Sequence, residues 1–513
     1  MTAQLQPIDL VAPGFLGLNL QQSGSLLSPQ YATKAENAVI DVASRLAARD
    51  GYTQDTTTDI TGTPAVKTLF EYLTADGTSE TIVAWDGGIG NDILDPEGND
   101  ISGSLTDTDG RWWMQNFNDK VIAFQDGQKP AVYTGTGNFA TVVESSGTAP
   151  TSHNGVGLAA FGRVWGLDSD AQTIKYSALL DETDWGGAGA GSIDMANIWT
   201  NGTDEVTAIQ AFNGSLVVFG KRHIVFWNDS QGSALGLDPN FIAVVDIITG
   251  TGTLTQWSIQ PVGQTDMLYL SRFGVQNISR VIQERSNPVG NLTKYVRDDL
   301  TAQLAQEDLT KVVSTYSPEN GFYLLTFVDQ GVTWVLDVRR RYIDDDREVV
   351  SIVTTWDLAP TSWLTKVNGT LHLGGTWGVG SYGGSDDNGV AFRFTYNSPW
   401  LDLGEQVANR LKMLKRLGSI LFVRNNTDIV YKWSVDFNDQ FRTITRSVDA
   451  DAGAEWGTGE WSIAEWSGGL TLRIIKIPSR ETGQYYRVAI EADVTGQFAL
   501  QQIELFTKIG RIA

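Results

Sequence analysis

Val164-Trp165-Gly166-Leu167, Asp168-Ser169-Asp170-Ala171-Gln172 and Thr173-Ile174-Lys175-Tyr176 follow one another and form the stretch that decides the fold of this chain. Two short apolar or alternating runs flank a polar segment, a pattern typical of two strands joined by a turn. Similar units recur between residues 66 and 392, with starts about 40–55 residues apart, the period of propeller blades. The candidate copies begin at Thr81, Val121, Val164, Leu216, Met267, Phe322 and Leu371.

These copies share a pattern of strands and turns rather than a sequence. One hairpin cannot bury its apolar face alone, whereas blades stacked radially bury both faces and leave only short edges exposed. The sequence therefore predicts an all-β fold whose centre is a β-propeller of six to seven irregular blades over residues 66–392. Closure of the ring requires a strand from one end of the chain to complete the other end.

The segments outside the repeat predict three additions to the propeller. Residues 1–65 form an N-terminal extension, in which Ser28-Pro29 predicts a short helix over 31–39 and alternation predicts a strand over 40–48. Leucines at a helical spacing predict a short helical insertion near 293–310. Residues 393–513 have a different strand spacing, which favours a β-sandwich-like platform domain.

Composition excludes several classes of protein. The 513 residues include no cysteine, so disulfides, thiolate metal sites and cysteine nucleophiles are ruled out. We see neither a secretory signal nor an apolar run long enough for a membrane helix, and we expect no membrane insertion. The net charge of −23, from 60 acidic and 37 basic residues, repels phosphates and argues against a protein that grips DNA.

Candidate chemistry in the sequence is weak, and we expect no catalytic, cofactor-binding or metal-binding residues. His153, His223 and His372 lack the spacing of a zinc site or catalytic triad. Segments 107–110 and 385–389 resemble calcium loops but lack the full pattern and the distal Glu, so Asx-rich turns are favoured. The glycine-rich segment 186–192 has no Lys and no clear βαβ context, which favours a loop over a phosphate site.

A basic cluster stands out in the C-terminal region. Arg410, Lys412, Lys415 and Arg416 alternate with Leu411, Met413, Leu414 and Leu417. This mixture indicates a partly buried segment, and contact with a neighbouring subunit or an acidic partner is an open alternative.

Three segments carry a resemblance to a known family. The first runs from Ala35-Glu36-Asn37 to Arg49-Asp50-Gly51, the second includes Arg163 and Tyr176-Ser177 and runs on to Trp185, and the third spans 206–219. In content, order and spacing they resemble the tail nozzle (tail hub) proteins of short-tailed bacteriophages, also described as packaged-DNA stabilisation proteins. The likeness covers roughly residues 15–280. In the C-terminal domain only the Trp-rich segment 455–466 and the closing strands look similar.

The resemblance implies a structural virion protein, made in the host cytoplasm and located in the tail. It implies a propeller with a platform domain, assembled as a homohexameric ring below the head-to-tail adaptor ring. Such a ring would continue the DNA channel, retain packaged DNA and release it on infection, without specific binding to the duplex. Tail fibres or tailspikes are further partners to expect, and the N-terminal arm would complete the propeller or contact the ring above.

Two rival functions remain open at this point. One is a glycan-degrading enzyme on a propeller, which needs two carboxylates placed on either side of a sugar bond. The other is a glycan-binding tail protein. A stable ring of copies favours the nozzle, whereas hydrolysis of a polysaccharide or glycan binding without turnover favours the rivals.

Overall fold

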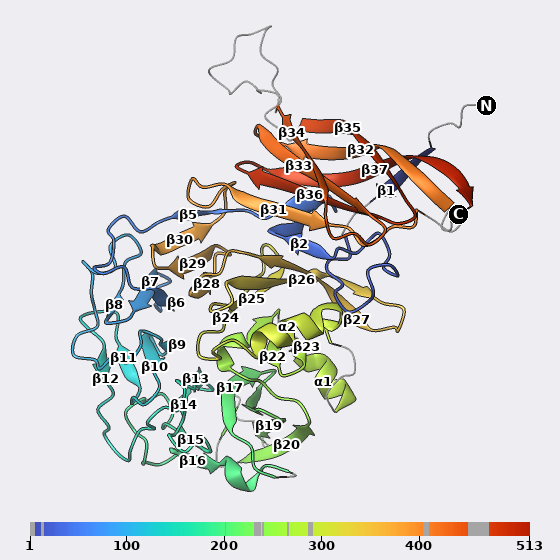
Figure 1. Ribbon diagram of the computed structural model, residues 1–513. Helices are drawn as coiled ribbons and strands as arrows, with labels where there is room; N and C mark the ends of the chain where they lie inside the picture. Colours follow the sequence, from blue (N-terminus) through green and yellow to red (C-terminus); the bar gives the residue numbers. More distant parts are fainter. Residues whose placement is uncertain are drawn as a thin grey trace.

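The computed structural model describes residues 6–11, 15–200, 202–229, 237–238, 241–263, 266–285, 291–403, 410–449 and 471–512. Within these residues, seven blades of antiparallel strands follow one another around a ring, which confirms the all-β propeller (Figure 1). Six of them are separate small sheets, and the sixth blade along the chain is part of a larger sheet. The first blade consists of β6 (Val66–Leu73), β7 (Ser79–Trp85) and β8 (Gly88–Gly90), and the second of β9 (Trp113–Phe117), β10 (Lys120–Phe124), β11 (Ala131–Tyr133) and β12 (Ala140–Thr141). The third blade consists of β13 (Gly157–Ala160), β14 (Arg163–Leu167), β15 (Thr173–Tyr176) and β16 (Gly191–Asp194). The fourth consists of β17 (Val206–Phe212), β18 (Ser215–Gly220), β19 (His223–Asp229) and β20 (Ile242–Thr249).

The last three blades carry the helices and the ring closure. The fifth blade consists of β21 (Gln260–Val262), β22 (Asp266–Ser271) and β23 (Gly274–Asn277). The sixth consists of β24 (Val313–Ser317), β25 (Phe322–Phe327), β26 (Val332–Ile343) and β27 (Val349–Trp356). The seventh consists of β28 (Ser362–Thr365), β29 (Leu371–Gly375), β30 (Gly378–Tyr382) and β5 (Tyr52–Gln54). Each of the seven candidate copies falls in its own blade. Innermost strands contact one another from β6 through β9 and β13 to β17 and from β21 through β24 to β28, and β28 packs on β6 where the ring closes.

The N-terminal region supplies the strand that closes the propeller. Strand β5 pairs antiparallel with β30, with Tyr52 opposite Tyr382, and so becomes the outer strand of the seventh blade. The ring of Tyr52 also stacks on Trp377, with centroids 4.6 Å apart. A strand from far away in the sequence thus joins the two ends of the ring by backbone hydrogen bonds and ring packing.

Two expectations for the N-terminal region are wrong. Residues 31–39 form no helix, because 34–36 are β2 (Lys34–Glu36) and pair with β27 and β31. Residues 40–48 are not one strand but a hairpin of β3 (Ala38–Ile40) and β4 (Leu46–Ala48), whose turn includes Ser44 at φ +62°. In both places pairing with distant strands outweighs local propensity.

Helical segments occupy few of the described residues. The expected insertion contains η3 (Lys294–Val296) and α2 (Arg297–Leu304), which buries Leu300 and Leu304. Helix α1 (Ile278–Glu284) directly follows the fifth blade and was not expected. Two short turns are η1 (Met195–Asn197) and η2 (Gln256–Ser258). None of the helices in these residues has the length and apolar character required to span a bilayer.

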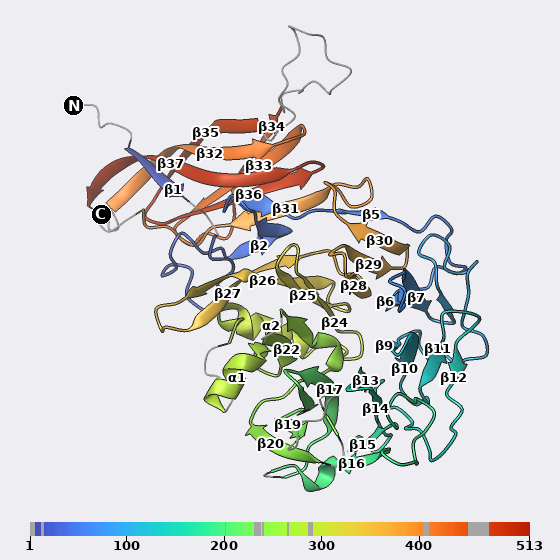
Figure 2. The same ribbon diagram turned by 180° about the vertical axis from the view of Figure 1, so that it is seen from behind.

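The platform consists of two packed sheets above the propeller (Figure 2). The outer sheet has the order β3-β4-β37-β32-β35, with β1 on β37; its remaining strands are β1 (Gln6–Val11), β32 (Arg410–Val423), β35 (Thr471–Gly483) and β37 (Phe498–Ile512). The inner sheet contains β2, β31 (Phe392–Asn397), β36 (Tyr486–Val494), β33 (Thr427–Val435) and β34 (Arg442–Val448). The Trp-rich segment 455–466 lies outside the described residues.

One sheet runs through both bodies. In the described residues, strands β24 to β27 of the sixth blade continue through β2 into β31, β36, β33 and β34, a sheet of nine strands. A single hydrophobic cluster likewise includes Trp334 of the propeller together with Leu417 and Ile490 of the platform. Because a hydrogen-bonded ladder and a shared core cross the boundary, the platform is joined to the propeller by more than a linker.

The carboxylate of Glu491 in the inner sheet provides a pH-dependent contribution to stability. Burial raises its pKa, but hydrogen bonds and charge from Lys432 and Arg393 outweigh burial, so the pKa lies below the usual value of 4.5. A carboxyl with a lowered folded-state pKa stabilises the fold above its unfolded pKa, and this contribution is lost as pH falls through the folded pKa.

We expect Glu491→Gln to destabilise the protein by about 1 kcal/mol at pH 7, since the ion pairs are partly solvent-exposed. At a pH well below 4.5 the gap between the variant and the original chain should close, because the carboxyl is then protonated in both states. Urea denaturation of both proteins at the two pH values measures this. If the difference in unfolding free energy between the two proteins is the same in acid as at pH 7, the stabilising role of the Glu491 carboxylate is contradicted.

Candidate functional site

The guanidinium of Arg49 lies at the junction of propeller and platform with its side chain fully buried. It forms a bidentate pair with Asp387, with Nη1–Oδ1 and Nη2–Oδ2 distances of 2.7 Å. Its Nε donates to Asn37 Oδ1 at 3.0 Å, Nη1 donates to the Asp50 carbonyl at 3.0 Å, and Nη2 donates to Asp357 Oδ1 at 3.3 Å. All five N–H donors of the fork therefore have an acceptor, which is the condition for burying this cation.

Charge and aromatic rings around Arg49 keep it cationic. Burial lowers its pKa, but the hydrogen bond and the charge of Asp387 more than compensate, and the pKa lies above the usual arginine value. The guanidinium carbon lies 4.0 Å from the centroid of the Phe392 ring and 6.0 Å from that of Trp356. These faces provide a low-dielectric enclosure in which the pair with Asp387 is strengthened.

Asn37 forms the corner at which the chain passes from one sheet to the other. Its φ of +53° lies in the left-handed region that Asn tolerates better than most residues. Its Nδ2 donates to the Arg393 carbonyl at 2.8 Å, and its Oδ1 accepts from the Asp357 amide at 3.1 Å. The same side chain therefore bonds the platform, the end of the sixth blade and, through Oδ1, Arg49.

Gly51 permits close approach of two backbones. A Cβ at this position would lie 1.7 Å from the carbonyl oxygen of Asp386, which is impossible without movement of the loop. The Gly51 amide donates to the Gly384 carbonyl at 3.2 Å, and the Tyr52 amide donates to the Asp386 carbonyl at 3.0 Å. Glycine here lets the N-terminal segment lie directly on the loop that carries Asp387.

The other three residues that carry the resemblance, Arg163, Tyr176 and Ser177, lie together in the third blade. Arg163 Nη1 donates to the Ser177 carbonyl at 2.9 Å, and its guanidinium lies 6.0 Å from the Tyr176 ring. Ser177 is fully buried; its Oγ accepts from the Val164 amide at 3.1 Å and donates to the Ala178 carbonyl at 3.0 Å. Tyr176 packs against Trp165 with centroids 5.0 Å apart. These contacts fix the end of the β14–β15 hairpin and present no reactive group.

The motif residues thus form two separate clusters. Figure 1 shows β14 and β15 low in the ring, whereas β5 and β30 lie directly below the platform. We name the cluster of Asn37, Arg49, Gly51, Asp357 and Asp387 the junction network. Its chemistry is structural, because the carboxylates and the amide are all engaged in holding the fold.

The expected Asx-rich turns agree with the contacts of both calcium-like segments. Asp387 is paired with Arg49, and Asp386 Oδ1 accepts from the Gly389 amide at 2.6 Å. In the other segment, Asp107 and Asp109 accept from Gln125 Nε2 at 2.6 Å and 3.1 Å. Across the described part of the chain, no group of three or more potential ligands is placed to hold a metal ion.

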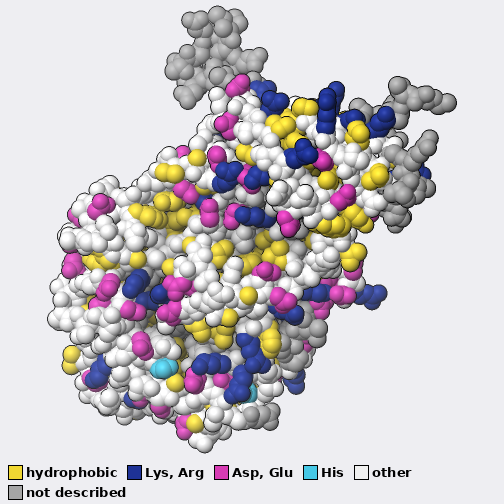
Figure 3. Space-filling model, viewed as in Figure 1, with side chains coloured by type: hydrophobic (Ala, Val, Ile, Leu, Met, Phe, Trp, Pro, Cys, Tyr) yellow, Lys and Arg dark blue, Asp and Glu magenta, His cyan; other side chains and the backbone are white. Residues whose placement is uncertain are grey.

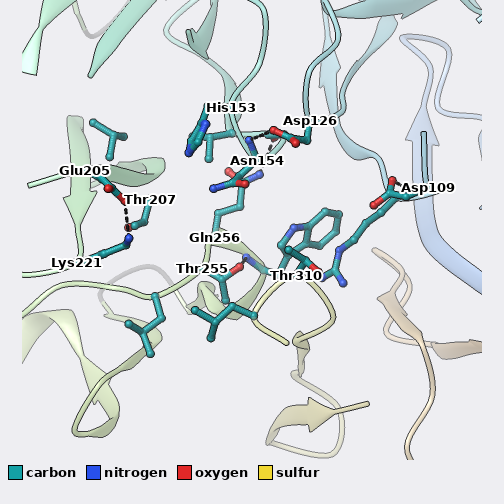
Figure 4. A pocket seen from close by; sticks show the side chains of 17 residues that line it. Asp109, Asp126, His153, Asn154, Glu205, Thr207, Lys221, Thr255, Gln256 and Thr310 are labelled. Carbon is teal, nitrogen blue, oxygen red and sulfur yellow. Dashed lines mark hydrogen bonds and ion pairs between the residues drawn. The ribbon is translucent and has the colours of Figure 1, made fainter. Parts of the chain in front are cut away.

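A polar pocket of about 240 Å³, which we name the axial pocket, lies between several blades (Figure 4). Its walls come from segments that lead into the innermost strands β9, β13, β17 and β24, and from η2. Three carboxylates line it, and each has a protein partner: Asp109 accepts from the Arg111 amide, Asp126 accepts from the Asn154 amide, and Glu205 pairs with Lys221. Each of the three carboxylates therefore already has at least one partner within the protein.

Two polar atoms in the wall of this axial pocket are unsatisfied. Among the described residues, neither Gln256 Oε1 nor Arg111 Nε has a hydrogen-bond partner. Burial lowers the pKa of Arg111 to about 9, which leaves it cationic at neutral pH, and its guanidinium lies 4.0 Å from the Trp257 ring centroid. The pocket wall therefore combines polar and aromatic groups, and two of its buried polar atoms have no protein partner among the described residues.

The three histidines lie in separate surroundings. His153 borders the axial pocket, and His372 Nδ1 lies 3.3 Å from the Ser381 hydroxyl. His223 is buried, with Nδ1 2.8 Å from Asp204 and Nε2 2.7 Å from the Thr200 carbonyl. Each is held by its own blade, and the three do not converge on a site.

Sequence reasoning missed the acceptors of the junction network and the axial pocket. Asp387 is separated from Arg49 by 338 positions, and no spacing rule connects them. Gln256 and Trp257 belong to a short turn with no recognisable motif. For Asp387 the only signal was an aspartate-rich loop, which sequence alone assigns to a turn.

Comparisons with known proteins give the fold context. No protein-family model and no curated protein matches this sequence. Among solved structures, it is similar to BamB from Moraxella catarrhalis, with 12% identity, a TM-score of 0.38, and coverage of 68% of this chain and 92% of that chain. It is also similar to the WD40 β-propeller domain of Doa1, with 10% identity, a TM-score of 0.29, and coverage of 52% of this chain and 88% of that chain. At these scores the likenesses say nothing about function, and the propeller assignment rests on the sheet order of this chain.

Proposed function

We propose that this chain is a non-enzymatic structural subunit of a virion: the tail nozzle of a short-tailed bacteriophage. Copies assemble as a homohexameric ring below the head-to-tail adaptor ring and continue the DNA channel. The ring retains packaged DNA and releases it on infection, and tail fibres or tailspikes are further partners. The protein acts mechanically, by shape and assembly.

The observation that carries this proposal is the junction network. Asn37, Arg49 and Gly51 come from the segment that resembles the nozzle family, and they meet where arm, propeller and platform join. Their contacts build the shape of the subunit, and a family motif with a structural role suits a building block better than an enzyme. The sheet shared by propeller and platform supports the same view, because a subunit under DNA pressure needs a stiff connection.

Charge is consistent with a conduit for DNA. Residues 1–392 carry 22 Lys and Arg against 46 Asp and Glu, a net charge of −24. Such a surface offers a passing duplex few phosphate contacts, so the duplex would not be retained by binding.

Electron microscopy of particles tests the proposal. A short affinity tag inserted after Gly137, a glycine with an open surrounding at an exposed turn, allows gold labelling of the chain in intact virions. We expect the label at the tail tip, and we expect particles assembled without the chain to lose DNA to added nuclease. Label on the capsid shell, or full DNA retention without the chain, would refute the proposal.

The axial pocket favours glycan binding as a second candidate function. Its wall combines Trp257, Gln256 and Arg111, residue types that recognise sugars through ring packing and hydrogen bonds. Glycan-array binding that is lost in Gln256→Leu would support this function. Release of reducing ends from a polysaccharide would instead support the enzyme alternative.

A further inference from the structure

The platform has an outward sheet face that no part of the described chain covers. Figure 1 shows β32 and β35 on the side of the platform away from the propeller. Side chains on one face of each strand pack into the core, including Leu417 and Ile477, whereas those on the other face are exposed. We name this surface the outward face.

Hydrophobic and basic side chains share the outward face. Leu472 and Ile474 are 49% and 60% exposed near the start of β35, and Met413 on the neighbouring strand β32 is 37% exposed. At the other end of these strands, beside Met413, a shallow hollow of about 780 Å³ is lined by Lys415, Arg416, Arg480 and Lys508 together with Glu481. Lys476, two residues from Ile474, lies over the Phe506 ring. Figure 3 shows dark blue and yellow side chains together over the platform.

This combination indicates a protein partner with an acidic surface. Exposed aliphatic side chains gain by leaving water, which a phosphate backbone cannot provide, and the surrounding cations select negative charge. The chain itself contains such a surface. The platform, residues 393–513, has 15 basic and 14 acidic residues, so the whole negative excess of the protein lies before it.

Within the part of the chain before the platform, the segment with the strongest acidic bias includes the first blade. Residues 68–110 contain ten Asp and Glu and not one Lys or Arg. Glu97 and Asp100 are exposed there, and Leu94 beside them is 52% exposed. An acidic surface with an exposed leucine complements a basic surface with an exposed isoleucine.

We propose that the outward face of one copy docks on the acidic first blade of a second copy. The outward face points away from its own propeller, so the acidic surface has to come from another molecule. The contact joins two different patches and is therefore head-to-tail, a type that generates a ring when the rotation between copies closes and a filament when it does not. This inference deepens the proposed function and rests on it, since it assigns the surface through which nozzle subunits associate.

Charge reversal tests the contact in solution. We expect sedimentation velocity to show concentration-dependent assembly of the unmodified chain, weakened by salt. Lys476→Glu combined with Arg480→Glu should raise the concentration for half-assembly at least about tenfold, because like charges then face each other. Arg297→Glu combined with Lys311→Glu makes the same change in net charge on exposed propeller residues and should have little effect.

A charge swap provides the specific readout. Glu97→Lys combined with Asp100→Lys should impair assembly alone and restore it when mixed with the Lys476→Glu/Arg480→Glu protein. Circular dichroism checks that every variant is folded. Three outcomes would overturn the proposal. The control pair could impair assembly equally, or the mixture could fail to restore assembly. The unmodified chain could also stay monomeric up to about millimolar concentration.

Two further results separate this inference from the proposed function. Duplex DNA binding that is lost in Lys476→Glu/Arg480→Glu, with assembly unchanged, would show that the face binds nucleic acid and would overturn the contact. Normal tails in virions carrying those substitutions would overturn the contact and leave the nozzle function intact. If the charge-swapped proteins assemble when mixed but no gold label is found at the tail, the contact is supported and the nozzle function is refuted.

Discussion

Arg49→Met is expected to destabilise the protein by about 3–5 kcal/mol, the cost of removing one partner from a buried ion pair. The substitution retains much of the side-chain volume but leaves the Asp387 carboxylate, 20% exposed, without its cation. It also removes the Nε donor to Asn37 and the Nη1 donor to the Asp50 carbonyl. Guanidinium denaturation, together with hydrogen exchange of residues 37–54, measures the loss.

A matched exposed pair provides the control for Arg49. Lys34 pairs with Glu36 at 2.8 Å, with side-chain exposures of 47% and 33%, and Lys34→Met should cost less than about 1 kcal/mol. In an Asp387→Asn background the effect of Arg49→Met should shrink, because the unpaired charge is gone. If Arg49→Met costs no more than Lys34→Met, the junction network does not hold propeller and platform together.

Gly51→Ala is expected to destabilise the protein by about 3 kcal/mol, at the upper end for an added methyl group in a packed site. The new Cβ would lie 1.7 Å from the Asp386 carbonyl oxygen, so either the N-terminal segment or the 384–387 loop has to move. Movement of either lengthens the bonds of Arg49 to Asp387. Loss of protection in hydrogen exchange at both segments is the measurement.

Gly24→Ala is the matched control for this substitution. A Cβ on Gly24 would lie 3.4 Å from Trp400 Cδ1, an ordinary contact, and we expect a change within about 0.5 kcal/mol. Similar losses at Gly24 and Gly51 would mean that the close approach at Gly51 is not the reason for glycine there.

Stiffness is the mechanical consequence of the junction. A ladder of backbone bonds runs from β27 through β2 to β31, and Arg49 bonds both sides of the same boundary. A force on the platform is therefore transmitted to the sixth and seventh blades. For a nozzle subunit, this connection would couple events at a ring interface to the propeller.

The sequence by itself determined the class of fold and the position of the blades. Each of the seven candidate copies became a blade, because the alternation of short runs and turns is a local property that a propeller repeats. The resemblance also singled out Asn37 and Gly51, and the structure places both at positions that few other residues tolerate. The sequence-based prediction failed at residues 31–48, where the pairing of β2 with β31 and of β4 with β37 overrides local propensity.

Only the tertiary structure decided what those residues bond to and which surfaces are left over. Asp387 became the partner of Arg49, and β5 the last strand of the ring, through contacts between segments more than 300 positions apart. The outward face emerged because one side of β32 and β35 packs on the core while the other side does not. Such pairings depend on how the ring closes in space, and local patterns carry no information about closure.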